Sequence, residues 1–209
     1  MNIWMTLQKA VSLYPAKIGV VDGAQRFTYA QVGQRVGSLG LFLRRNGIRS
    51  RDRIAILEIN SHRFLEAYYA SAGIGAILTP LNFRLSAKEL AYILRDSQAR
   101  WLLANARFAH LVEATLKEDN PLEGIIWIER SPDLPVGIPQ LQYEEALLAE
   151  PGQFLPEPIS EDQVAHLYYT SGTTGKPKGV ILTHRNVCVH ALGTIAELHL
   201  TDRDVWAHV

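Results

Sequence analysis

The sequence predicts an α/β fold in which a mostly parallel β-sheet is flanked by helices. One observation is a βαβ pattern, in which a nearly continuous apolar run at 53–59 and a short strand pattern at 76–79 enclose an amphipathic helix. A second is that strand and helix patterns keep alternating along the rest of the chain. A third is that 47% of the 209 residues are hydrophobic, enough for one substantial core or two small ones.

The first 47 residues are predicted to form helices and one strand that belong to a second, incomplete sheet. Residues 3–13 are weakly helical, and residues 17–21 form a strand. Thr28 is the expected N-cap of a long amphipathic helix, because apolar residues recur after it at intervals of three or four. Gly47 stands where a glycine that terminates a helix belongs.

Residues 48–200 are predicted to form an α/β subdomain that carries a phosphate-binding loop at 170–179. Asn60 or Ser61 can cap the helix between its first two strands. A capping box, Ser86 to Glu89, precedes the next helix. The remaining predicted strands lie at 101–104, 125–128, 167–169 and 180–183, and the remaining helices lie at 108–117, at 143–148 and from 184–186 onward.

The end of the chain, residues 201–209, is predicted to be a turn followed by the start of a truncated strand. This strand, at 205–209, has no cap, turn or polar tail behind it. The family resemblance described below implies that the chain is an N-terminal fragment. Apolar surface left uncovered by absent strands makes a homodimer one expected way of covering it.

The predicted phosphate loop is rich in glycine, hydroxyl groups and lysine, and it separates two hydrophobic strands in the stretch LYYTSGTTGKPKGVILTHRN, residues 167–186. Glycines permit positive φ and a close approach of the backbone to a ligand, so consecutive N–H groups can converge on an anion. The hydroxyls add hydrogen-bond donors, and two lysines flank Pro177, which restricts the backbone between them. The loop therefore has the composition of a polyphosphate site.

We assign three roles within this loop. Lys178 is the candidate catalytic residue, because the reaction implied by the family resemblance described below needs positive charge at the phosphate leaving group. The predicted phosphate contacts are Thr170, Ser171, Thr173, Thr174 and Lys178, with Gly172, Gly175 and Gly179 supplying backbone geometry and Lys176 an outer positive charge. Each charge-assisted hydrogen bond to phosphate contributes about 1.5–3 kcal/mol, so a few of them suffice to hold a triphosphate.

Two other interpretations of the loop are disfavoured. A Walker P-loop requires GxxxxGK[ST], whereas Gly172 and Gly175 are spaced as G-x-x-G and Pro177 follows Lys176 where the hydroxyl should be. A flexible linker rarely places two lysines around a proline between two buried strands.

The run YYTSGTTGKPKGV followed by THRN resembles the signature of the adenylate-forming superfamily, which includes acyl-CoA synthetases, luciferases and peptide-synthetase adenylation domains. Residues 73–100 also resemble a core segment of acyl-CoA synthetases. The resemblance implies that the loop holds the β- and γ-phosphates of ATP while a carboxylate attacks the α-phosphate. It further implies Mg²⁺, coenzyme A as co-substrate, and a carboxylic acid, in the first instance a fatty acid, as substrate.

The resemblance covers essentially all 209 residues, yet these are less than half of a usual family member. The family segments for adenine, ribose and magnesium, and the C-terminal domain with its adenylation lysine, would follow residue 209. Two alternatives therefore stay open. One is an adenylating enzyme with another acceptor, a carrier protein or oxygen. The other is a catalytically incompetent fragment that binds a nucleotide or a partner.

Charge and composition exclude several other classes. The formal net charge is zero, with 21 acidic and 21 basic residues, which leaves no electrostatic case for nucleic-acid binding. Cys188 is the only cysteine, which excludes an internal disulfide, and the 7 histidines show no metal-ligand spacing. The start of the chain lacks the features of a signal peptide, and no apolar run is long enough to span a membrane. We expect a cytoplasmic protein.

Overall fold

The computed structural model describes residues 1–130, 132, 134–135, 137–148, 152–170 and 176–207. Within these residues, β1 (Ile18–Asp22) and β2 (Gln25–Thr28) form a small antiparallel sheet. The large sheet contains, in spatial order, β7 (Gln140–Gln142), β6 (Gly124–Ile128), β5 (Ala99–Asn105), β3 (Arg53–Leu57), β4 (Ile77–Pro80), β8 (Val164–Thr170) and β9 (Lys178–Thr183).

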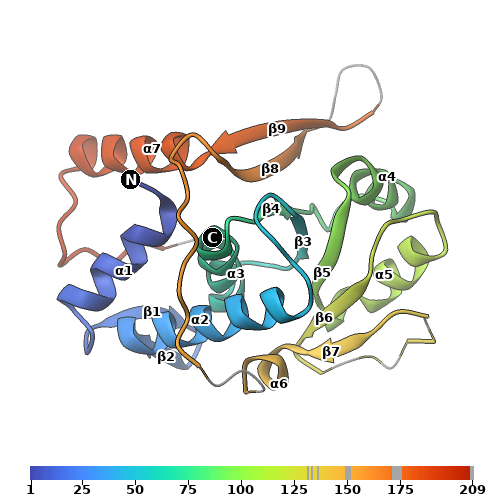
Figure 1. The fold of residues 1–209 in the computed structure, drawn as a ribbon, viewed down its shortest axis with the longest axis horizontal. Coiled ribbons are helices and arrows are strands. Elements are labelled where there is room, and N and C mark those ends of the chain that lie inside the picture. Colours follow the sequence, from blue (N-terminus) through green and yellow to red (C-terminus); the bar gives the residue numbers. More distant parts are fainter. Residues whose placement is uncertain (131, 133, 136, 149–151, 171–175, 208–209) are drawn as a thin grey trace.

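Helices cover both faces of the large sheet (Figure 1). They are α1 (Ile3–Leu13), α2 (Tyr29–Arg45), α3 (His62–Ile74), α4 (Ala87–Ser97), α5 (Ala109–Leu116), α6 (Tyr143–Leu148) and α7 (His184–Leu198), with a short 3-10 helix, η1 (Ala106–Phe108), before α5. Every neighbouring pair of strands in the large sheet is parallel except β8 and β9, which are antiparallel. The predicted fold class, a mostly parallel sheet flanked by helices, is confirmed.

The central strand β3 explains why its sequence is apolar throughout. Ile54 and Ile56 belong to a core shared with α1, α2, α3 and α6, whereas Ala55 and Leu57 belong to a core shared with α4 and α5. All four side chains are at most 1% exposed. Because successive side chains of a strand point to opposite faces, both faces of β3 must be apolar.

The helix starts follow the predicted capping chemistry. The hydroxyl of Thr28 accepts a hydrogen bond from the Gln31 backbone N–H, and Ser86 forms the expected capping box with Glu89. Of the two candidates before α3, Ser61 is the N-cap. These side chains satisfy backbone N–H groups that have no partner within the helix.

Two strands were absent from the sequence prediction. Residues 25–28, interpreted as the approach to a helix, form β2, which turns back onto β1 through Gly23 at φ 57°. Residues 140–142 form β7, which pairs with β6. Both strands are short and half polar, so neither has an apolar run that marks it in the sequence.

The N-terminal segment shares the main core. Val36 and Leu39 of α2 lie in the same cluster as Ile54 and Trp101 of the large sheet. That β1 and β2 belong to a second, incomplete sheet, with a boundary at residue 47, remains a proposal.

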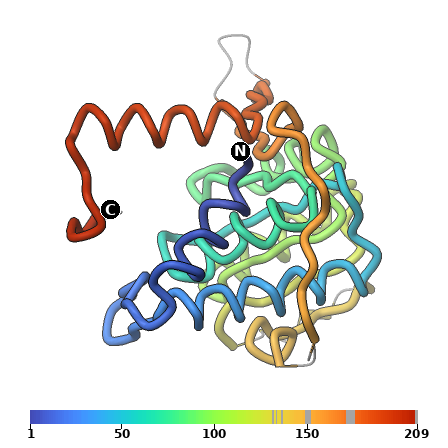
Figure 2. The backbone as a smooth tube through the Cα atoms, turned by 60° about the vertical axis from the view of Figure 1, so that its left-hand side comes forward, coloured from blue at the N-terminus to red at the C-terminus, as the bar shows by residue number. Residues whose placement is uncertain are grey.

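The predicted strand at the end of the chain is not formed. Residues 205–207 have no strand structure, and residues 208 and 209 lie outside the described residues. A strand requires hydrogen bonds to a neighbour, whereas Val205 is 94% exposed. Figure 2 shows α7 extending away from the body of the molecule, with the C-terminal segment beyond it.

No helix in the described part of the chain is both long enough and apolar enough to cross a membrane.

Candidate phosphate-binding site

The candidate site lies on the hairpin formed by β8 and β9, along one edge of the large sheet (Figure 1). The two strands pair up to Thr170 opposite Lys178, so the predicted loop starts where the ladder ends. Ser171, Gly172, Thr173, Thr174 and Gly175 lie outside the described residues. Their assignment as phosphate contacts and as geometry therefore remains a prediction.

The described residues of the loop are placed at the two arms of the hairpin. Thr170 is the last residue of β8, and Lys178 is the first residue of β9. Lys176 precedes Pro177 in the outgoing arm, and Thr170, Lys176 and Lys178 are all exposed. The register thus brings a hydroxyl and an ammonium group, eight positions apart in the chain, to directly opposite positions.

The structure shows how Gly179 packs, and its role in the geometry of phosphate binding remains a prediction. It lies within β9, opposite Tyr169, and the described glycines with positive φ are Gly23, Gly47 and Gly75. A Cβ atom at Gly179 would lie 3.0 Å from Cδ1 of Leu167. The backbone of Gly179 is therefore not left-handed, and a side chain at this position would press on Leu167.

The ammonium groups of the two hairpin lysines, Lys176 and Lys178, are not neutralised by any carboxylate that the structure describes. The Lys178 ammonium forms no hydrogen bond or ion pair with any residue that the structure describes. The Lys176 ammonium lies 5.9 Å from the ring centroid of Tyr92 on α4. By contrast, Arg35, Arg100 and Arg185 each bind two carboxylates. Unpaired positive charge at a loop favours an anionic ligand.

Two tyrosines anchor β8 just before the loop. The Tyr168 hydroxyl lies 2.7 Å from the hydroxyl of Tyr68 on α3, and the Tyr169 hydroxyl donates to Asp96 on α4 at 2.6 Å. Burial, together with the bond to Asp96, raises the pKa of Tyr169, so its hydroxyl keeps its proton at neutral pH. Because neighbouring strand residues face opposite ways, the strand is held from both faces.

Sequence reasoning missed Tyr68, Tyr92 and Asp96. They are 70 or more residues from the loop in sequence, and each lies on a helix whose pattern indicates only packing. The usable signal was the pair Tyr168 and Tyr169 in a strand, since adjacent half-buried tyrosines on opposite faces each favour a hydrogen-bond partner.

Comparison with known proteins places the chain in a family. Residues 7–209 match the family described as AMP-binding enzyme. The chain belongs to this family. The expected membership in the adenylate-forming superfamily is thereby confirmed.

Curated relatives of this chain are CoA ligases. It is 37% identical over 212 residues to a long-chain-fatty-acid–CoA ligase of Thermus thermophilus, covering 98% of this chain and 38% of that protein. It is 34% identical over 190 residues to a feruloyl-CoA synthase of an Amycolatopsis species, covering 89% of this chain and 34% of that protein. The chain thus spans little more than a third of the relatives it matches.

Solved structures agree on the fold. An anthranilate CoA ligase in complex with anthranoyl-AMP superposes with a TM-score of 0.85 at 25% identity, covering 92% of this chain and 36% of that one. A Mycobacterium tuberculosis fatty acyl CoA synthetase gives a TM-score of 0.75 at 28% identity, covering 94% and 37%.

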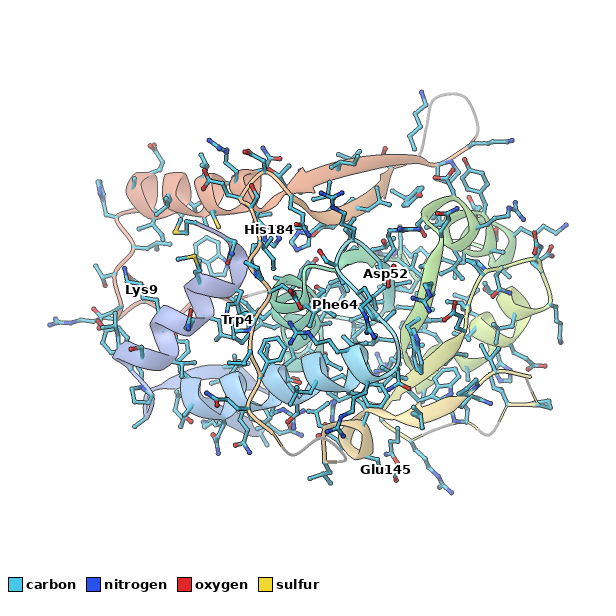
Figure 3. All side chains as sticks on the ribbon, in the orientation of Figure 1. Trp4, Lys9, Asp52, Phe64, Glu145 and His184 are labelled. Atoms are coloured by element: carbon cyan, nitrogen blue, oxygen red, sulfur yellow. The ribbon has the colours of Figure 1, made fainter. Side chains whose placement is uncertain are left out.

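Two buried histidines, one on β8 and one at the start of α7, have ring nitrogens without a hydrogen-bond partner among the described residues. Both ring nitrogens of His166 on β8, and Nε2 of His184, have no partner among the described residues. The Ile3 backbone N–H donates to Nδ1 of His184, which is the first residue of α7 (Figure 3). Burial lowers the pKa of each histidine from 6.5 to about 4, and the proximity of His184 adds to the effect on His166.

The free energy of unfolding is expected to fall as the pH drops from 6.5 toward 4. In this window the unfolded chain takes up protons on His166 and His184 that the folded chain excludes, so their contribution is complete above pH 6.5 and is lost below it. Urea unfolding at several pH values measures the slope. His166→Phe keeps a ring against Tyr68 and removes one titration, so the slope should decrease; an unchanged slope would contradict the prediction.

No group of three or more His, Cys, Asp or Glu side chains in the described residues is arranged to hold a metal ion. Cys188 is buried, and burial raises its thiol pKa, which disfavours a thiolate nucleophile at this position.

Proposed function

We propose that the whole protein activates a carboxylic acid with ATP and then transfers the acyl group to coenzyme A, releasing AMP. The observation that carries this proposal is the position of Lys178 directly opposite Thr170, with no partner for its ammonium among the described residues, at the mouth of a loop with the composition of a polyphosphate site. Family membership and CoA-ligase relatives support the reaction class.

In this proposal the hairpin binds the triphosphate. A carboxylate oxygen forms a bond to the α-phosphorus, and the bond from that phosphorus to the pyrophosphate oxygen breaks. The thiol sulfur of coenzyme A then attacks the acyl carbon, and AMP leaves. Both the nucleophile and the leaving group of the first step are anionic, so positive charge placed beforehand lowers the barrier. Lys178 would supply that charge, with Lys176 farther out.

Mg²⁺ belongs to the proposal as the counter-ion that ATP brings with it. When bound, it would neutralise charge on the phosphate oxygens. The hydroxyl of Thr170, and those of Ser171, Thr173 and Thr174 if placed as predicted, would bind phosphate oxygens directly. No described carboxylate cluster is available to hold the ion independently.

The acid is proposed to be a fatty acid, because the relative that covers 98% of this chain is a long-chain-fatty-acid–CoA ligase. A feruloyl-CoA synthase among the relatives makes an aromatic acid the first competitor. A cytoplasmic location and a homodimer remain predictions.

Acid-dependent exchange of labelled pyrophosphate into ATP tests the proposed reaction. The whole protein is incubated with Mg-ATP and a panel of aliphatic and aromatic acids, and exchange is expected with at least one fatty acid. Thioester formation with free coenzyme A, compared with a carrier protein, separates the acceptors. If no acid in the panel supports exchange, adenylation is not the activity.

For the 209 residues alone we propose nucleotide binding without turnover. The chain covers only 38% of the Thermus relative, so most of such a ligase lies outside it. Calorimetric titration with Mg-ATP should show binding, and no AMP should form with acid and coenzyme A. Formation of AMP by these residues would contradict this part of the proposal.

A further inference from the structure

Helix α4 contacts both arms of the candidate phosphate hairpin. Tyr92 and Asp96 are four residues apart on this helix and therefore lie on the same side of it. Asp96 meets the incoming arm at Tyr169, and Tyr92 meets the outgoing arm at Lys176. Along the chain, residues 171–175 follow the first of these two contacts and precede the second.

The contact with the incoming arm is short and directional. The Tyr169 hydroxyl donates to Oδ2 of Asp96 at 2.6 Å, a charge-assisted bond of the stronger kind. Tyr169 immediately precedes Thr170, the first predicted phosphate contact. The hydrogen bond therefore restrains the strand one residue before the loop begins.

The contact with the outgoing arm is a cation–π interaction. The Lys176 ammonium lies 5.9 Å from the centroid of the Tyr92 ring, at the outer limit of such contacts. Lys176 is exposed, whereas the Tyr92 ring is half-buried against the core that contains α4 and α5. A fixed ring thus restrains a long side chain that would otherwise be mobile, two positions before Lys178.

We propose that Tyr92 and Asp96 are positioning residues that seat the two arms of this hairpin on α4 and so preorganise it for ATP. This inference rests on the function proposed above. Neither side chain is proposed to touch the nucleotide. Both act by restraining Tyr169 and Lys176 before ATP binds, so that less ordering of these two residues is left to the binding step.

A purely structural role for Tyr92 is the competing explanation, because the ring also packs in the core. Tyr92→Leu removes the π-face and keeps an apolar side chain, whereas Tyr92→Phe keeps the ring and removes only the hydroxyl. Packing alone predicts that the effect of Tyr92→Leu is independent of residue 176. Preorganisation through Lys176 predicts that it disappears when Lys176 is replaced.

The experiment measures the KM for ATP in pyrophosphate exchange by the whole protein. Tyr92→Leu should raise this KM by about twofold to fivefold with little change in kcat, and Tyr92→Phe should restore the wild-type value. In a Lys176→Met background, Tyr92→Leu should add nothing further. Tyr169→Phe and Asp96→Ala should each raise the KM for ATP. The double variant should have a KM no higher than that of either single variant.

A second readout requires no nucleotide. Reductive ¹³C-methylation of lysines should place the Lys176 resonance under the ring current of Tyr92, with a shift that is lost in Tyr92→Leu and kept in Tyr92→Phe. The inference is overturned if this shift is absent, or if Tyr92→Leu raises the KM equally with and without Lys176. Failure of the wild-type protein to bind ATP, with the ring-current shift present, would instead refute the proposed function.

Discussion

Replacing Lys178 with alanine is expected to slow acid-dependent pyrophosphate exchange by roughly 10- to 100-fold in the whole protein, the loss that follows from one charge-assisted hydrogen bond to phosphate. The side chain is exposed and has no partner among the described residues, so its removal leaves no buried group unsatisfied. The melting temperature should therefore be unchanged. Exchange kinetics and thermal unfolding of the same preparation measure the two quantities.

Lys176→Ala is the matched control for Lys178→Ala. It removes the same charge from an exposed side chain two residues away, in the position assigned to an outer screen. Its effect on exchange should be several times smaller, because screened charges at a greater distance interact more weakly. Equal effects of the two variants would contradict the assignment of Lys178 as the catalytic lysine, and so would normal exchange by Lys178→Ala.

Replacing Arg35 with methionine is expected to lower the free energy of unfolding by about 3 kcal/mol or more. The guanidinium of Arg35 on α2 binds Glu66 on α3 at 2.5 Å and Glu144 on α6 at 2.8 Å. Glu66 is only 1% exposed, and its other side-chain partner is the buried Tyr143 hydroxyl, at 2.7 Å. Without Arg35, a carboxylate stays buried with one neutral donor.

Urea unfolding of Arg35→Met and of a matched variant, Arg95→Met, measures the difference. Arg95 makes a 3.6 Å pair with Asp119, whose side chain is 85% exposed, so its loss should cost less than about 1 kcal/mol. For a chain of this size, the larger effect corresponds to a decrease in melting temperature of roughly 6–12 °C. Similar losses in the two variants would show that burial of Glu66 does not set the cost.

Local chemistry made most of the fold predictable. Thr28, Ser61 and Ser86 cap helices with hydroxyls that bond to N–H groups within three residues, so their signal is contained in a few letters of sequence. The apolar run of β3 likewise reports a local requirement, that of a strand covered on both faces. The strands that were missed, β2 and β7, are stabilised by pairing with neighbours and not by their own composition.

The candidate site, like the fold, has features that could be predicted from the sequence and features that could not. Residues 170–179 could be recognised because hydroxyls, glycines and lysines are concentrated in one loop, where their order is itself the evidence. Gly179 shows the limit of that reasoning, since its missing side chain makes room for Leu167 on the neighbouring strand. Whether residues 205–207 form a strand likewise depends on whether a neighbouring strand is present to pair with them.

By itself, the sequence determined the α/β class and the helix starts, because each depends on interactions between residues close together in the chain. The phosphate-binding role of residues 170–179 remains a prediction. Tertiary structure alone decided that Tyr92 and Asp96 contact the two arms of the β8–β9 hairpin, that Arg35 joins three helices and that His166 and His184 are buried without full hydrogen bonding among the described residues. These outcomes depend on packing between segments that are distant in the chain. A buried polar side chain affects stability or function through the partners that this packing gives it.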